Sequence, residues 1–192
     1  MTAEPQRRLS ADDYLALERA SETRSEYLDG EVFAMAGASR EHNLIATNVV
    51  GTLHPQLKAR GCEKYASDMR VRIAATGLYT YPDVVVVGGQ PRFEDEERDT
   101  LLNPTLIVEV LSPSTEDYDR GRRFAHYRSI PSLQVYLLVR QDRAHVELFT
   151  RQRDDRWVLW ETDDLGATVD LSAIGATIAL ADVYDRVPGV SI

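Results

Sequence analysis

A chain of 192 residues with 43% hydrophobic content can build one ordinary hydrophobic core, so we expect residues 1–192 to form a single domain. Its 31 acidic and 22 basic residues give a formal net charge of −9, which argues against a protein that coats nucleic acid through overall charge. No segment approaches the roughly 18 to 20 apolar residues of a membrane span, and no apolar signal segment opens the chain, so we expect a cytoplasmic protein without a membrane partner.

The first third of the chain predicts two helices separated by a hairpin. Ser10 is a typical cap for a short helix that runs to about residue 20. Asp29-Gly30 stands between two apolar pairs, which is a strong hairpin signal because both residues tolerate a positive φ. Ser39 then caps a long helix with apolar residues at three-to-four spacing, and Gly61 ends it.

The rest of the chain alternates strands with one further helix. The helix covers about residues 117–129, between a Ser-Pro-Ser-Thr break and an Ile-Pro-Ser end. The expected strands are 63–66, 69–74, 83–87, 105–111, 134–139, and a hairpin of 145–149 with 157–160. Continuously apolar strands between helices predict an α/β fold in which helices flank a central mixed β-sheet on both faces.

Two acidic residues occupy strand positions where Val, Ile or Leu would be expected. Asp83 opens the strand that continues with four valines, and Glu109 stands in the middle of another apolar strand. An ionised carboxylate in such a place costs roughly several kcal/mol unless a cation or hydrogen-bond donors contact it. If the strands are neighbours, the two carboxylates converge and would bind Mg²⁺ or Mn²⁺, with the backbone carbonyl of Val110 as a third oxygen.

Each acid also has a purely structural interpretation. Asp83 follows a proline and by itself would most simply hydrogen-bond a turn. Glu109 would be satisfied without a metal if a buried arginine, such as Arg70 or Arg72, paired with it. Only the two acids together favour a metal site.

The residues around both acids resemble a known family. The segments that carry the resemblance are Tyr81-Pro82-Asp83-Val84-Val85-Val86, 104–115, Tyr118-Asp119-Arg120-Gly121, Asp29-Gly30-Glu31, 36–39 with Glu41-His42-Asn43, and Ser67-Asp68-Met69-Arg70. Together they are similar to the Uma-type restriction endonuclease family of the PD-(D/E)XK nuclease superfamily, over nearly the whole chain. The resemblance implies a restriction-endonuclease-like core and an endonuclease that cleaves phosphodiester bonds with a divalent metal.

Site residues follow from this resemblance position by position. Asp83 and Glu109 match the two acids that bind the metal, which would polarise the phosphate and lower the pKa of an attacking water. Glu31 and Asp68 are weaker candidates for the same acidic cluster. His42 is an accessory candidate, although a histidine at a helix start more often only packs or hydrogen-bonds. The implied partners are nucleic acid, with DNA expected first, and a second copy in a homodimer.

The chain departs from the superfamily at its lysine. That lysine normally lies two residues after the second acid, where this chain has Leu111, and the family places one on the following helix, where Arg123 stands. The chain has 20 arginines and only two lysines, Lys58 and Lys64. Arg123 is therefore the expected phosphate contact, with Arg120 near it, but an arginine cannot easily act as a general base. Val135 also replaces a glutamate that the family usually has.

Two other classes of function remain open. The missing lysine and the acidic charge are compatible with a catalytically degenerate nuclease fold that serves as a binding or assembly module. A metal-dependent hydrolase of another phosphoester is the third hypothesis. Trp157 and Trp160, on the C-terminal hairpin, are expected in the core or in a dimer contact.

Overall fold

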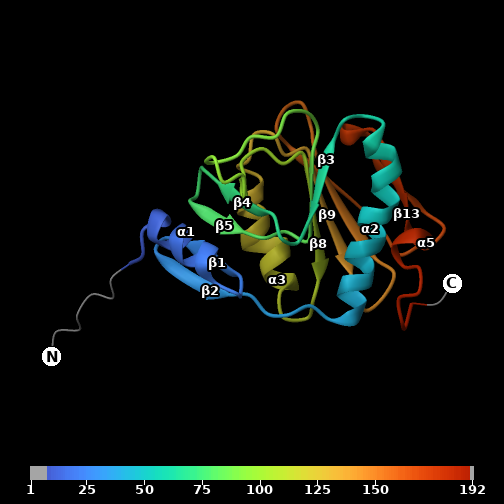
Figure 1. Ribbon diagram of the computed structural model, residues 1–192. Helices are drawn as coiled ribbons and strands as arrows, with labels where there is room; N and C mark the ends of the chain where they lie inside the picture. Colours follow the sequence, from blue (N-terminus) through green and yellow to red (C-terminus); the bar gives the residue numbers. More distant parts are fainter. Residues whose placement is uncertain (1–7, 191–192) are drawn as a thin grey trace.

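A six-stranded mixed sheet forms the centre of the computed structural model, which describes residues 8–190 (Figure 1). β8 and β9 are parallel, and the other neighbours are antiparallel. In spatial order the strands are β11 (Trp157–Thr162), β10 (Val146–Arg151), β9 (Val135–Arg140), β8 (Leu106–Leu111), β6 (Val84–Val87) and β3 (Glu63–Ala66). Helices cover the sheet, so the predicted α/β fold with a central mixed sheet is confirmed.

One face of this sheet packs against α2 (Arg40–Lys58) (Figure 1). Its cap is Ser39, whose hydroxyl accepts a hydrogen bond from the His42 amide at 3.0 Å, as the sequence predicts. The helix buries residues at three-to-four spacing, namely Ile45, Val49, Leu53 and Leu57. The small sheet of β12 (Thr168–Leu171) and β13 (Ala176–Ala179), the short 3₁₀ turn Ser172–Ile174 and α5 (Leu180–Val183) complete this layer.

The segment that follows β8 covers the opposite face. Instead of one helix over 117–129, the structure has α3 (Glu116–Tyr118), a π-helical turn (Asp119–Arg123) and α4 (Phe124–Tyr127). A π turn is wider than an α turn and is frequent at functional sites. Phe124 and Tyr127 face the core as predicted. Phe124 stacks on Tyr136 of β9, and Tyr127 meets the same ring in a T-shaped contact.

A second, five-stranded sheet lies beyond this segment and was not predicted. Its order is β2 (Glu31–Ala34), β1 (Ser25–Leu28), β5 (Leu78–Thr80), β4 (Arg70–Ile73) and β7 (Thr100–Leu101). α1 (Ala11–Ala20) covers β1 and β5 through contacts of Tyr14 with Tyr27 and Tyr79. The predicted hairpin turn is confirmed, since Asp29 and Gly30 have φ values of 51° and 87°. Within the described residues, no helix has the length and apolarity that crossing a membrane requires.

Candidate active site

Asp83 and Glu109 lie opposite each other at one end of the β6–β8 pair. The antiparallel register pairs Val84 with Val108 and Val85 with Ile107. Continued by one residue, this register places Asp83 opposite Glu109, and directly opposite residues present their side chains on the same face. The structure therefore brings together the two acids that the strand pattern singled out.

Two hydrogen bonds fix the carboxylate of Asp83. Its Oδ1 lies 2.8 Å from His42 Nε2, and its Oδ2 accepts a bond from the Val110 amide at 2.7 Å. His42 reaches this point from the first turn of α2, and Val110 directly follows Glu109 on β8. His42, an accessory candidate in the sequence, thus joins the acid pair as a partner of Asp83.

Glu109 is buried, with 3% of its surface exposed, and has two partners from the segment behind β8. The Tyr127 hydroxyl donates a hydrogen bond to Oε1 at 2.7 Å, and Arg123 Nη1 lies 3.5 Å from the same oxygen. Both the phenol and the guanidinium thus contact the carboxylate of Glu109 through the same oxygen, Oε1. Both partners come from the π turn and α4.

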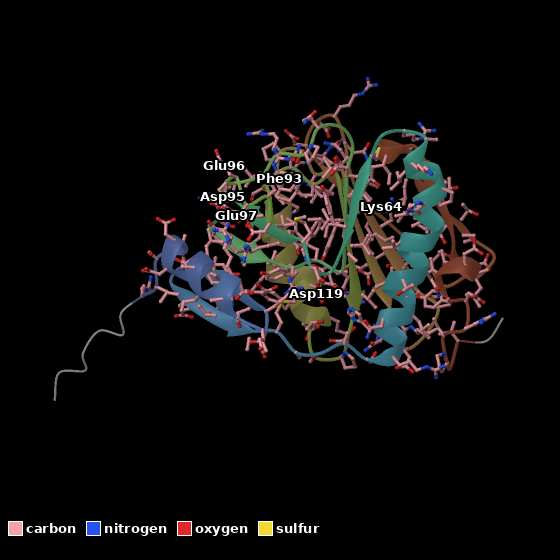
Figure 2. The ribbon with its side chains drawn as sticks, viewed as in Figure 1. Lys64, Phe93, Asp95, Glu96, Glu97 and Asp119 are labelled. Carbon is pink, nitrogen blue, oxygen red and sulfur yellow. The ribbon has the colours of Figure 1, made fainter. Side chains whose placement is uncertain are left out.

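A buried arginine does contact Glu109, as the structural interpretation expected, but it is Arg123 and not Arg70 or Arg72. Arg70 and Arg72 both belong to the five-stranded sheet. Arg70 pairs with Asp99 at 2.8 Å, and Arg72 pairs with Glu94. Glu94 begins the acidic loop whose next residues are labelled in Figure 2, at the outer edge of that sheet. These two arginines form ion pairs within the second sheet and its acidic loop, and Arg123 is the arginine that contacts Glu109.

Arg123 faces three carboxylates at once. Its Nη2 lies 2.6 Å from Glu26 Oε1, and its Nη1 lies 2.9 Å from Asp119 Oδ1 as well as 3.5 Å from Glu109. The guanidinium also lies over the Tyr118 ring, 4.9 Å from its centroid. Asp119 is 1% exposed, and Figure 2 shows it on the segment between the N-terminal hairpin and the six-stranded sheet. One guanidinium therefore meets three carboxyl groups in a buried place.

Glu26 and Asp119 are site residues that the sequence interpretation missed. Glu26 lies on β1, where the Thr80 hydroxyl also donates to it, and it is 7% exposed. Its only sequence signal is an acid inside a short strand. Asp119 carries a clearer signal, because it precedes Arg123 by four residues, a spacing at which helical side chains meet.

Burial dominates the electrostatics of this cluster. It raises the pKa of Glu109 well above its usual range, and Arg123 and the Tyr127 hydrogen bond only partly oppose that rise. Burial likewise raises the pKa of Asp119. For Arg123, burial lowers the pKa, but Glu109 and the other carboxylates outweigh it, so the guanidinium stays charged. The carboxylates are thus the groups that lack compensation.

Three other predicted residues lie outside this cluster. Glu31 is exposed on β2, and its carboxylate forms no ion pair with residues 8–190. Asp68 is exposed and pairs with Arg24. Arg120, although it shares the π turn with Arg123, pairs with Glu116 at 2.8 Å and Glu147 at 2.6 Å. The structure thus does not bring Glu31, Asp68 or Arg120 to the acid pair.

No lysine takes the place of the superfamily lysine at this site. Leu111 is buried in the apolar cluster between the six-stranded sheet and the π-turn segment. Lys58 lies at the end of α2 opposite to His42, and Lys64 lies on β3, apart from Asp119 in Figure 2. Arg123 is the cation that contacts Glu109.

The oxygen atoms at this place are of the hard type that Mg²⁺ and Mn²⁺ prefer. The Val110 amide points toward Asp83, so the Val110 carbonyl points to the same side of β8. The residue opposite Val110 in the continued register is Pro82, which has no N–H to donate to that carbonyl. Asp119 Oδ1 is buried and has no aligned hydrogen bond. Within residues 8–190, however, no group of three or more His, Cys, Asp or Glu side chains has the arrangement of a metal site.

Comparison with known proteins identifies the family. The model of the Uma2 family, described as "Putative restriction endonuclease", matches residues 11–181. The chain belongs to the Uma2 family. Two relatives come from Synechocystis sp. (strain ATCC 27184 / PCC 6803 / Kazusa). "Uncharacterized protein sll1609" is 38% identical over 85% of this chain and 93% of the relative, and "Uncharacterized protein slr1290" is 35% identical over 92% of each chain.

A solved structure supports the Uma2 fold. The crystal structure of a "putative nuclease belonging to DUF820" from Anabaena variabilis ATCC 29413 superposes with a TM-score of 0.68 at 20% identity. The match covers 91% of this chain and 96% of the other. The resemblance to the Uma-type family and its restriction-endonuclease-like fold is confirmed, and the Uma2 description indicates a nuclease.

Proposed function

We propose that the chain is a Mg²⁺- or Mn²⁺-dependent endonuclease that hydrolyses phosphodiester bonds in nucleic acid, with DNA as the expected substrate. The observation that carries this proposal is the placement of Asp83 opposite Glu109 on neighbouring buried strands. Uma2 membership supports the same reaction class. The overall charge of −9 means that substrate binding depends on local contacts and not on a general positive field.

The proposed metal ligands are the carboxylates of Asp83 and Glu109 and the carbonyl of Val110. A divalent cation bound there would polarise the phosphate and make a nucleophile available from water at neutral pH. His42 and the Val110 amide hold one oxygen each of Asp83, at 2.8 and 2.7 Å, so this carboxylate is oriented before any ligand arrives. Preorganisation of this kind is what a metal-dependent site requires.

Arg123 supplies positive charge beside Glu109. A guanidinium stabilises the negative charge that grows on the phosphate during hydrolysis, but it does not release a proton readily enough to act as a base. Its Nη2 is bound to Glu26 at 2.6 Å, so direct contact with the scissile phosphate requires that ion pair to open. Arg120, bound to Glu116 and Glu147, would require a similar release.

Cleavage assays test this proposal. Purified protein is incubated with plasmid, single-stranded DNA and RNA, each with Mg²⁺, Mn²⁺ or EDTA. We expect divalent-dependent cleavage that falls to background in Asp83→Asn and in Glu109→Gln. Asp68→Asn is the matched control, because it removes an exposed carboxylate away from the acid pair and should cleave like the wild type. Cleavage that persists in the double variant of Asp83 and Glu109 would rule the site out.

A second candidate function is a nucleic-acid-binding module without catalysis. Two observations favour it. Arg123 is already paired with three carboxylates, and Leu111 stands at the position of the superfamily lysine. This function predicts that oligonucleotides bind with the same affinity to wild type and Glu109→Gln, and that no metal supports cleavage. Measurable cleavage by the wild type excludes it.

We also propose that the protein forms a homodimer through β11. β11 is an edge strand of the six-stranded sheet, and its consecutive residues Val158, Leu159 and Trp160 are 51%, 47% and 42% exposed. An edge strand with exposed apolar side chains and free backbone groups is a template for pairing with another strand. Two copies of β11 would pair antiparallel about a two-fold axis.

A further inference from the structure

Two large apolar side chains lie on the face of the second sheet that also carries Glu26. Phe33 of β2 lies directly opposite Glu26 of β1, and directly opposite residues share a face. Met35 follows Phe33 by two residues, and its amide continues the ladder by donating to the Arg24 carbonyl at 3.0 Å. Phe33 and Met35 are 48% and 38% exposed. Both apolar side chains are therefore open to solvent, beside an acid that contacts Arg123.

The other face of the same hairpin has different surroundings. Tyr27 of β1 is buried and stacks on Tyr14 of α1. Val32 lies opposite Tyr27 and shares its face. Because side chains alternate along a strand, Phe33 and Met35 point away from α1. The side of the hairpin that they occupy is the side of the acid cluster.

The chain that leaves β2 connects this face with the acid pair. Residues 35–39 are exposed and end at Ser39, the cap of α2. In the view of Figure 1 this segment runs below α3 to the start of α2. His42, in the first turn of α2, contacts Asp83 at 2.8 Å. The apolar face is thus continuous with the proposed active site, since it lies in the chain between Glu26 and His42.

The burial of the acid cluster limits the kind of nucleic acid that reaches it. Glu109 is buried, and the side chains of Asp83 and Arg123 are 16% and 11% exposed. A duplex is stiff over about 150 base pairs, so its phosphates stay on a regular helical path. A single strand bends between neighbouring nucleotides, which lets one phosphate approach a recessed site while its bases stay at the surface. The recessed acids and the exposed apolar face together favour a single strand.

Two exposed arginines flank the cluster along the chain. Arg122 precedes Arg123 on the π turn, and Arg40 is the first residue of α2. Neither forms an ion pair with another residue of the described range 8–190. Glu31, at the turn end of the apolar face, is an exposed acid, so a phosphate backbone is attracted toward Arg40 and away from the turn. Aromatic side chains beside cationic groups are the usual surface for unpaired bases and their backbone.

We infer that Phe33 stacks on an unpaired base of the substrate, with Met35 packed beside it, and that the nucleic acid is single-stranded next to the acid pair. The inference rests on the proposed function and names the strand class of its substrate. Phe33 is then a specificity-determining residue that contacts a base and not the metal. DNA and RNA strands offer the same stacking surface, so both belong to the test.

Fluorescence anisotropy measures binding apart from cleavage. The probes are a labelled DNA strand, the RNA strand of the same sequence and the DNA duplex, each in EDTA and in Ca²⁺. Wild type should bind at least one single strand more tightly than the duplex. Phe33→Ala should weaken single-strand binding by about 5- to 150-fold, the effect of losing one stacked base, and should leave duplex binding unchanged. Duplex binding as tight as single-strand binding, or no binding of any probe, would overturn the inference.

Val32→Ala is the matched control. Val32 has the same exposed fraction as Phe33, 48%, and lies next to it on β2, but on the opposite face. Its loss should leave all affinities as in wild type, and Phe33→Trp should keep single-strand binding because it keeps an aromatic ring. Equal losses in Val32→Ala and Phe33→Ala would contradict stacking. A dimeric wild type that becomes monomeric in Phe33→Ala would show that a second copy covers this face, which also overturns the inference.

The outcomes separate this inference from the proposed function. Single-strand binding that depends on Phe33, without cleavage in any metal, supports the inference and refutes the hydrolysis. Cleavage of duplex that Phe33→Ala leaves unchanged supports the hydrolysis and overturns the inference. A dependence on Phe33 for only one of the two strands supports the inference and identifies that strand as DNA or RNA.

Discussion

Glu109 shows at the scale of a residue how a buried acid is compensated. It stands in an apolar strand, and burial raises its pKa because the ionised form loses its hydration. The Tyr127 hydroxyl, 2.7 Å from Oε1, and Arg123 lower that pKa in part. The sequence shows the acid but not its partners, which follow it by 14 and 18 residues and approach it only because the π-turn segment folds back over β8.

Tyr127→Phe should destabilise the protein and raise the pKa of Glu109 further. The hydroxyl is the closest donor to Glu109, and a buried acceptor that loses its partner costs about 1–3 kcal/mol. Urea unfolding measures the change in the free energy of unfolding. Tyr136→Phe is the control, because its hydroxyl donates to the Asp119 carbonyl at a longer 3.2 Å and should cost less. Equal stability of Tyr127→Phe and wild type would contradict the role of this bond.

Two elements position the side chains of the site: the first turn of α2 and the π turn. The first turn of α2 brings His42 to Asp83, and the π turn brings Asp119 and Arg123 to Glu109. The cap and the start of α2 follow from local sequence, since Ser39 precedes an amphipathic run. The π turn has no comparable local signal. In this turn Arg120 pairs with Glu147, whereas Arg123 contacts Glu109. Regular helical spacing does not predict that the two side chains point to different partners.

Ser39→Ala tests the contribution of the α2 cap to the site. Loss of an N-cap hydroxyl costs about 0.5–2 kcal/mol, and here the same hydroxyl holds the His42 amide and contacts Gln141. We expect lower thermal stability and also weaker cleavage, because His42 orients Asp83. Ser10→Ala removes the equivalent cap of α1, which contacts the second sheet, and should lower stability without changing cleavage by the remaining folded protein. Equal loss of activity in both variants would speak against a positioning role of the α2 cap.

The whole molecule joins two sheets at the acid cluster. Glu26 belongs to the five-stranded sheet and Glu109 to the six-stranded sheet, and the Arg123 ion pairs link them. β2 and β11 are edge strands of the two sheets. β11 exposes three consecutive apolar residues, which is why the dimer is proposed there.

Light scattering after size-exclusion chromatography tests the dimer. Wild type should elute with the mass of two chains, and Leu159→Lys should elute as a monomer, because a charge on an edge strand opposes strand pairing. Val32→Lys places the same charge on β2, the edge strand of the other sheet, and should stay dimeric. A monomeric wild type would refute the dimer, and a monomeric Val32→Lys would move the interface to β2.

The sequence by itself determined the features that depend on near neighbours in the chain. The caps at Ser10 and Ser39, the Asp29-Gly30 turn and the alternation that places Asp83 and Glu109 on strand faces are all readable locally, because backbone preferences and side-chain periodicity act over a few residues. Only the tertiary structure decided that Glu26 and Asp119 enclose Arg123 and that Arg120, Glu31 and Asp68 lie outside. These outcomes depend on which strands share a sheet and on the π turn, and strand pairing between distant segments is set by the packing of the whole core.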